Sequence, residues 1–113
     1  MGDRGNIQIK DAFAKGDGVF LYSHWGGTEL PKTLAYALDS PEGRGRWDDR
    51  AYLARIIFDH MTRGSASPET GFGIDTAEMD PEHNTLVVDC SEKTVDGVPF
   101  ADFIRYAQKK VYV

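Results

Sequence analysis

Alternating apolar and polar residues near the N-terminus predict a β-hairpin. Ile7-Gln8-Ile9 alternates in this way, and Val19-Phe20-Leu21-Tyr22 is an apolar run of residues that favour strands. Between them, Lys15-Gly16-Asp17-Gly18 is a strong turn signal. The second strand runs into Ser23-His24-Trp25-Gly26-Gly27-Thr28. We therefore expect His24 and Trp25 to close the second strand.

A first helix is predicted directly after the two glycines. Its apolar residues recur at helical spacing and form one stripe: Leu30, Leu34, Ala37 and Leu38. Thr28 is the expected N-cap, because its hydroxyl can accept a hydrogen bond from a free amide of the first turn. Ser40-Pro41-Glu42-Gly43 carries the turn residues expected to end the helix.

A second helix of about four turns is predicted to begin at an Asp48 cap and to end near Met61. Apolar side chains spread over most of its circumference and leave a narrow polar strip that holds Arg55 and Asp59. A helix with so wide an apolar surface is expected to be mostly buried against the sheet. His60 falls on the apolar arc, and we interpret it as a core histidine with its hydrogen bonds satisfied.

Short strands and a final helix are predicted in the C-terminal half. The strands are Phe72-Gly73-Ile74, Leu86-Val87-Val88 and a short edge strand at Lys93-Thr94-Val95, which precedes an Asp96-Gly97 turn. Pro99 is expected to open the last helix. The apolar face of that helix consists of Phe100, Phe103, Ile104 and Ala107.

The order of elements, β-β-α-α-β-β-(β)-α, predicts the α+β class and a single domain over residues 1–113. Sequential strands are joined by short turns. We therefore expect a mostly antiparallel sheet of roughly four to five strands, with about three helices packed on one face. A chain of 113 residues is long enough for one compact core and no more.

Charge and cysteine content narrow the classes of function. Thirteen Lys and Arg residues against eighteen Asp and Glu residues give a net charge of −5, which argues against non-specific binding of nucleic acids. Cys90 is the single cysteine, so a reducing compartment is expected. No apolar run approaches the ~20 residues of a membrane span, and the first ten residues lack a signal-peptide core. We expect a cytoplasmic protein without a membrane anchor.

Metal binding and nucleophilic catalysis find little support in the sequence. His24, His60 and His83 lie far apart and no HxxxH or CxxC spacing occurs, so no metal or cofactor is predicted. Cys90 ends an apolar strand run, where a thiol is usually an inert small hydrophobe. Ser23 and His24 point to opposite faces of a strand and cannot form a nucleophile–base pair. No catalytic residue is assigned, although His24 stays open as a general acid or base.

The first candidate site is the turn between the second strand and the first helix. Gly26 and Gly27 allow a tight turn. The free amides of the following helix start, Thr28 among them, favour a bound anion such as phosphate. At the rim, Trp25 could stack on a base and His24 could donate to a phosphate. The alternative is a plain strand-to-helix turn with Trp25 in the core.

The second candidate cluster comes later in the chain. Arg46 and Trp47 are residue types that grip a phosphate and stack on a ring, and Arg55 lies on the polar strip of the second helix. In the structural alternative, Trp47 packs against the start of that helix and Arg46 is solvated or pairs with acids. Arg55 would then pair with nearby carboxylates in an internal ion network.

Several segments carry a resemblance to one group of proteins: Arg4-Gly5-Asn6-Ile7-Gln8-Ile9, Val19 to Gly27, and Leu30-Pro31. They follow the pattern R-[GS]-N-I-x-[IV], then [VI]-x-[LI]-Y-x-H-W-x-G, then L-P, which resembles small uncharacterised proteins from phages, prophages and bacteria. One branch of the group is also similar over Arg46-Trp47-Asp48-Asp49, Tyr52 to Phe58, and Thr70 to Ile74. Some members carry Asp where Gly26 stands here. The resemblance implies a phage-related setting, in the cytoplasm of a host cell.

That setting leads to three hypotheses about function. Small acidic phage proteins without catalytic motifs often inhibit host defence. By analogy, the first hypothesis is a homo-oligomeric sponge that traps a small nucleotide-like signal without cleaving it, through the two candidate clusters. The second is a nucleotide-cleaving enzyme that uses His24 as acid or base. The third is an anti-CRISPR-like inhibitor that binds a host effector protein, its acidic surface facing a basic nucleic-acid channel.

Overall fold

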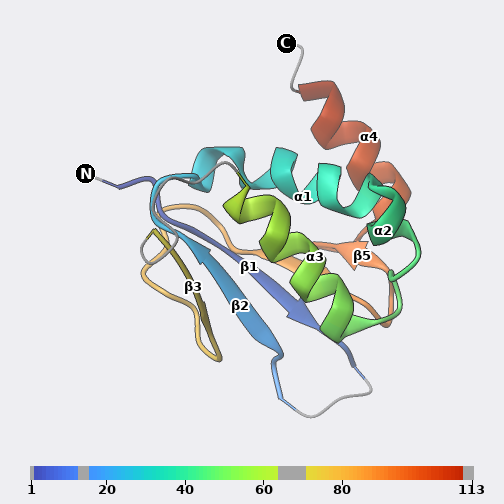
Figure 1. The fold of residues 1–113 in the computed structure, drawn as a ribbon, viewed down its shortest axis with the longest axis horizontal. Helices are drawn as coiled ribbons and strands as arrows, with labels where there is room; N and C mark the ends of the chain where they lie inside the picture. Colours follow the sequence, from blue (N-terminus) through green and yellow to red (C-terminus); the bar gives the residue numbers. More distant parts are fainter. Residues whose placement is uncertain (1, 13–15, 64–70, 111–113) are drawn as a thin grey trace.

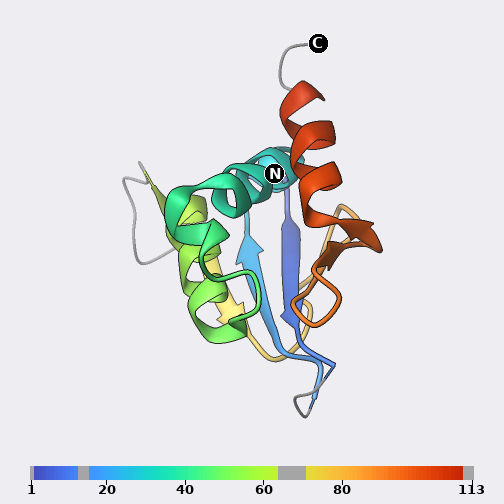
Figure 2. The ribbon, with the colours of Figure 1, turned by 90° about the vertical axis from the view of Figure 1, so that its right-hand side faces the viewer.

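The computed structural model describes residues 2–12, 16–63 and 71–110, which form a sheet with helices on one side (Figures 1 and 2). The strands are β1 (Gly5–Lys10), β2 (Val19–Ser23), β3 (Phe72–Asp75), β4 (Leu86–Asp89), β5 (Thr94–Val95) and β6 (Val98–Pro99). The helices are the 3₁₀ turn η1 (Gly27–Glu29), α1 (Leu30–Asp39), α2 (Pro41–Arg44), α3 (Arg50–Thr62) and α4 (Phe100–Lys110). Within these described ranges, no helix is both long enough and apolar enough to cross a lipid bilayer.

The strands pair in the order β3-β2-β1-β4-β5-β6. The predicted N-terminal hairpin is confirmed, with Ile7 opposite Leu21; residues 13–15 of its turn lie outside the described residues. All neighbours are antiparallel except β1 and β4, which run parallel. The parallel pair arises because the chain leaves β3 at the outer edge and returns through residues 76–85 to start β4 beside β1.

The α+β class is confirmed, whereas the predicted numbers of elements were too low. Six strands and four α-helices are found in the described residues. The additional strand β6 has two residues and the additional helix α2 has four, and such short elements show no hydrophobic periodicity. Since β6 pairs outside β5, the strand at Thr94–Val95 is internal and the prediction of an edge strand there was wrong.

Alternate residues of the central strands face the helices and form the core. Ile7 and Ile9 of β1 and Val88 of β4 have no exposed surface, as the period of two in a half-buried strand requires. They form one cluster with apolar residues of the helices, among them Leu34, Leu53, Ile57, Phe100 and Ile104. Full burial of one such side chain stabilises the fold by roughly 1.5–3 kcal/mol. The predicted apolar face of the last helix is confirmed: Phe100, Phe103, Ile104 and Ala107 are buried.

The helix starts differ from the predicted caps. Thr28 lies inside the 3₁₀ turn, and α1 begins only after Glu29. The predicted stop at residues 40–43 is confirmed, since α1 ends at Asp39, but the same residues also start α2, where the Ser40 hydroxyl accepts a hydrogen bond from the Gly43 amide at 3.0 Å. The cap of α3 is Asp49 rather than Asp48, because an Asp49 carboxylate oxygen accepts from the Tyr52 amide at 3.2 Å.

Helix α3 is less buried than its composition predicted. Its buried residues are Leu53, Ile57 and Met61, while Tyr52 is 56% exposed, because the sheet and α1 cover one side of the helix (Figure 2). His60 is largely enclosed, but its Nε2 has no hydrogen-bond partner in the part of the chain that the structure describes. Burial lowers the pKa of His60. The prediction of a core histidine with satisfied hydrogen bonds was therefore wrong.

Candidate functional site

The end of β2 presents an aromatic cluster at the surface. The Tyr22 hydroxyl lies 2.7 Å from Nδ1 of His24, and the His24 and Trp25 rings meet edge to face with centroids 4.6 Å apart. Trp25 is 59% exposed, and it lies against Gly71, where an added Cβ would be 2.6 Å from the indole. Trp25 is therefore not in the core, and this part of the plain-turn alternative is wrong.

The amides of the turn after Trp25 are bonded to the chain's own acceptors. The Thr28 amide donates to an Asp3 carboxylate oxygen at 2.9 Å and the Gly27 amide to the Asp3 carbonyl at 2.6 Å. The Gly26 amide donates to the Ser23 hydroxyl at 2.9 Å. An internal carboxylate thus occupies the position at the helix start where the sequence predicted a phosphate, in agreement with the preference of helix starts for anions.

A histidine that the sequence did not connect to this turn completes the arrangement. Residues 76–85 fold back across the end of the sheet, and His83 contacts the second carboxylate oxygen of Asp3. The hydrogen bond from the Thr28 amide, followed by that from His83, lowers the pKa of Asp3 to about 2. Both bonds favour the charged carboxylate.

We expect Asp3 to make stability depend on pH in acid. Its pKa is about 2 in the folded protein against an ordinary 3.8. The carboxylate therefore stabilises the fold fully above the ordinary value, and this contribution is lost as the pH falls from about 4 through about 2. Asp3→Asn should be less stable than the wild type at pH 7 and lose less stability across that window. Urea unfolding at a series of pH values measures both effects. An unchanged slope in D3N would contradict the assignment, and Asp48→Asn is a charge-matched control.

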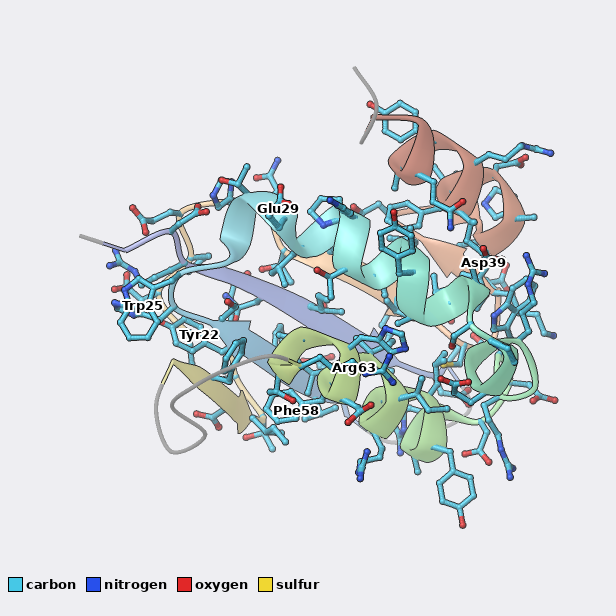
Figure 3. The ribbon with its side chains drawn as sticks, turned by 45° about the horizontal axis from the view of Figure 1, so that its top comes forward. Tyr22, Trp25, Glu29, Asp39, Phe58 and Arg63 are labelled. Atoms are coloured by element: carbon cyan, nitrogen blue, oxygen red, sulfur yellow. The ribbon has the colours of Figure 1, made fainter. Side chains whose placement is uncertain are left out.

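Arg46 and Trp47 lie at the other end of the molecule from Trp25. The ten residues of α1 separate the two places, which is about 15 Å at 1.5 Å per residue. Figure 3 shows Trp25 beyond one end of this helix and Asp39 at the other. Arg46 stacks on Tyr52, 4.5 Å from the ring centroid, and its guanidinium is 3.3 Å from Asp49.

Trp47 is a packing residue rather than a surface ring. It packs edge to face on Phe100 with centroids 5.2 Å apart, and its Nε1 donates to the Leu38 carbonyl at 2.9 Å.

Arg55 lies on α3, apart from both Trp25 and Trp47. Its side chain lies 3.9 Å from Asp59, so the predicted pairing with a nearby carboxylate is confirmed, but the side chain is 75% exposed and the predicted internal position is wrong. The structure does not bring the residues of the second candidate cluster together with His24 and Trp25, and their ligand-binding roles stay predictions.

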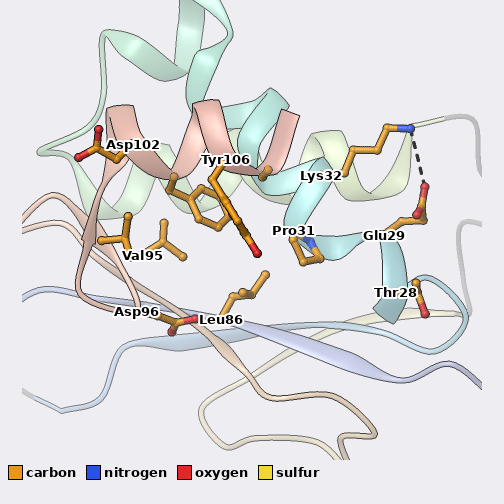
Figure 4. A pocket seen from close by; sticks show the side chains of 12 residues that line it. Thr28, Glu29, Pro31, Lys32, Leu86, Val95, Asp96, Asp102 and Tyr106 are labelled. Carbon is orange, nitrogen blue, oxygen red and sulfur yellow. Dashed lines mark ion pairs between the residues drawn. The ribbon is translucent and has the colours of Figure 1, made fainter. Parts of the chain in front are cut away.

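A groove between α1 and α4 was missed by the sequence reasoning. It has a volume of about 770 Å³. Its apolar lining includes Pro31, Leu86, Val95, Val98, Phe103 and Tyr106. Figure 4 shows Tyr106 reaching across the groove from α4 while Pro31 forms the opposite wall. No periodicity predicts this site, because its apolar lining comes from α1, β4, β5, β6 and α4, which meet only in the folded chain.

The distribution of acidic residues along the sequence does point to the part of the molecule that holds this groove. Residues 71–102 contain eight acidic side chains and a single lysine, whereas the rest of the chain has twelve basic and ten acidic residues. This acidic segment forms β3 to β6 and the start of α4, and it supplies Asp96 and Asp102 to the groove. Near the N-terminus, Arg4 compensates part of the charge, 3.4 Å from Asp80 and 3.7 Å from Glu82.

The described residues offer neither a metal-binding cluster nor an activated thiol. They contain no group of three or more His, Cys, Asp or Glu side chains placed to hold a metal ion. Burial raises the pKa of the Cys90 thiol to about 12, so the thiolate needed of a nucleophile is absent at neutral pH. No protein-family model, curated protein or solved structure matches this chain.

Proposed function

We propose that this protein is a non-catalytic binding protein that inhibits or occupies a basic partner protein, the third of the hypotheses above. The supporting observation is the uneven distribution of charge: residues 71–102 carry a net charge of −7, whereas the rest of the chain carries +2. Such a segment attracts a basic surface and steers its approach. A surface that normally holds nucleic acid is basic, so an effector protein with a nucleic-acid channel is the partner class we expect.

The test is capture of a partner followed by reconstitution. The purified chain, immobilised, is exposed to a bacterial lysate, and each captured protein is then purified and titrated against it by calorimetry. We expect a basic partner whose affinity falls as salt rises from 50 to 300 mM, on the order of tenfold or more. Asp80→Asn with Glu92→Gln should weaken binding about three- to thirtyfold if each exposed charge contributes about 0.3–1 kcal/mol.

The matched control removes the same number of carboxylates outside the acidic segment. Glu42→Gln with Asp48→Asn lies in and after α2 and should leave the affinity within about twofold of the wild type. If the affinity does not change with salt concentration, or if it falls equally in both double variants, the acidic segment does not direct binding.

Nucleotide sequestration is a second candidate, favoured by one observation. The indole of Trp25 is exposed and rests on a glycine, which makes it available to stack on a base. The amides that would hold the phosphate are bonded to Asp3 and Ser23. These bonds weigh against the phosphate site that the sequence predicted at the start of the first helix. Calorimetry with a panel of cyclic nucleotides tests it: binding lost in Trp25→Ala, with the nucleotide recovered intact after heating, would support a sponge. Altered nucleotide would support an enzyme, and no heat would exclude both.

A further inference from the structure

The rim of the α1–α4 groove is acidic. Glu29, Asp96 and Asp102 lie around it. The one lysine of the lining, Lys32, is 3.8 Å from Glu29, and Arg105 forms an ion pair with Asp102, so both of these carboxylates are compensated. Figure 4 shows Asp96 and Asp102 toward one end of the groove and the Lys32–Glu29 ion pair at the other. Among the described residues, Asp96 in the β5–β6 turn is therefore the rim carboxylate without an ion-pair partner.

Asp96 is held firmly in that position. The residue adopts a φ of 52° in the turn before Gly97, and one of its carboxylate oxygens accepts a hydrogen bond from the Val87 amide at 2.9 Å. A carboxylate fixed in this way needs little further ordering when a cation binds to it, which lowers the entropic cost of binding.

Between the charged ends, the groove is apolar and reaches the surface. Tyr106 is 60% exposed and Val98 is 41% exposed, while Val95 and Phe103 are buried beneath them. A phosphorylated ligand would meet the Asp96 carboxylate here and be repelled by it. An occupant that combines apolar side chains with a cation satisfies both parts of the surface.

The neighbouring sheet edge is closed to an added strand. β6 is two residues long and ends in Pro99, which has no amide hydrogen to donate, and α4 begins at the next residue. Recognition at this place must therefore use side chains rather than a β-ladder. The mode that presents apolar side chains in a row without needing backbone partners is an amphipathic helix lying in a groove.

We infer that the α1–α4 groove binds an amphipathic helix of the partner protein, with apolar residues spaced i, i+3 or i+4, and i+7 on the floor and a Lys or Arg near Asp96. This inference rests on the proposed function, and it adds the place of binding and the form of the partner segment. Tyr106 is the central anchor, since large half-exposed aromatic residues dominate such interfaces.

The experiment is a selection from a displayed library of helical peptides of about 18 residues, which is five turns, with the surface positions randomised. The probe is the purified full chain. Enriched peptides are synthesised and titrated against the wild type, Tyr106→Ala and Asp96→Asn. The asparagine keeps an oxygen for the Val87 amide and tolerates a positive φ. Tyr52→Ala on α3 is the matched control, because Tyr52 is equally exposed, at 56%. Thermal melts establish that all variants fold.

We expect enriched peptides with one apolar face and flanking Lys or Arg, an affinity loss of about tenfold in Tyr106→Ala, and a loss of about threefold with a weaker salt dependence in Asp96→Asn. Amide shifts of Leu86 and Val95 on titration would locate the peptide. Enrichment of acidic or non-periodic peptides, shifts elsewhere, or equal losses in Tyr106→Ala and Tyr52→Ala would overturn the inference. If a captured basic protein binds the acidic segment yet is unaffected by Tyr106→Ala, the groove inference fails while the proposed function stands.

Discussion

Trp47→Ala is expected to lower the free energy of unfolding by about 3 kcal/mol. Truncating a buried tryptophan typically costs about 3–5 kcal/mol, and the half-buried position of Trp47 places it at the lower end of that range. The variant loses the edge-to-face contact with Phe100 and leaves the Leu38 carbonyl without the indole donor. Equilibrium urea unfolding, followed by fluorescence of the remaining Trp25, measures the change.

Trp25→Ala is the matched control, because it removes the same side chain from an exposed position. Exposed substitutions usually change stability by about 0.5 kcal/mol or less, and the contact with Gly71 raises the expected loss to no more than about 1 kcal/mol. Equal losses in the two variants would contradict the assignment of Trp47 to packing and Trp25 to the surface. A ligand pocket shared by the two tryptophans would need both rings at the surface, free to stack on the ligand. A large loss of stability in Trp47→Ala and a small one in Trp25→Ala would argue against such a pocket.

The elements that the sequence predicted well are those with a long hydrophobic period. Leu30, Leu34 and Leu38 mark α1 because burial on one face repeats every three or four residues. The same rule found the buried face of α4. Short elements escaped because a strand of two residues, such as β6, owes its existence to a partner strand rather than to its own pattern. Helix caps were missed by one residue because a cap depends on which oxygen reaches the free amide.

The candidate site was harder to predict for a different reason. A ligand site requires side chains from distant segments to meet, and the residue types at Trp25 and Arg46 contain no information about the distance between them. The closing of the helix start by Asp3 depends on a residue some 25 positions earlier in the chain. The parallel pairing of β1 with β4 brings His83 to the same turn, and the predicted antiparallel sheet gave no reason to expect it. The acidic charge of residues 71–102 could be counted from the sequence, but the groove could not be predicted from it.

Asn6→Ala should destabilise the fold by about 2–3 kcal/mol, because it removes two of the hydrogen bonds that hold residues 76–85 against the sheet. Asn6 is 1% exposed, and its side chain bonds both polar groups of the Met79 backbone, donating to the carbonyl at 2.9 Å and accepting from the amide at 3.1 Å. A buried polar group left without a partner costs about 1–3 kcal/mol. Because Met79 is only half-buried, the combined cost for its amide and carbonyl should be less than twice that amount. Urea unfolding measures the loss.

Two further variants separate this attachment from a general effect of losing an amide side chain. Asn6→Asp retains an acceptor for the Met79 amide but sets an oxygen against the Met79 carbonyl, so it should be at least as destabilising as Asn6→Ala. Asn84→Ala removes an exposed amide from the same connection and should change stability by about 0.5 kcal/mol or less. Because residues 76–85 also carry His83 to Asp3, Asn6→Ala should in addition weaken the acid dependence of stability assigned to Asp3. A variant that unfolds more easily yet keeps the wild-type slope between pH 4 and pH 2 would show that His83 reaches Asp3 without the Asn6 attachment.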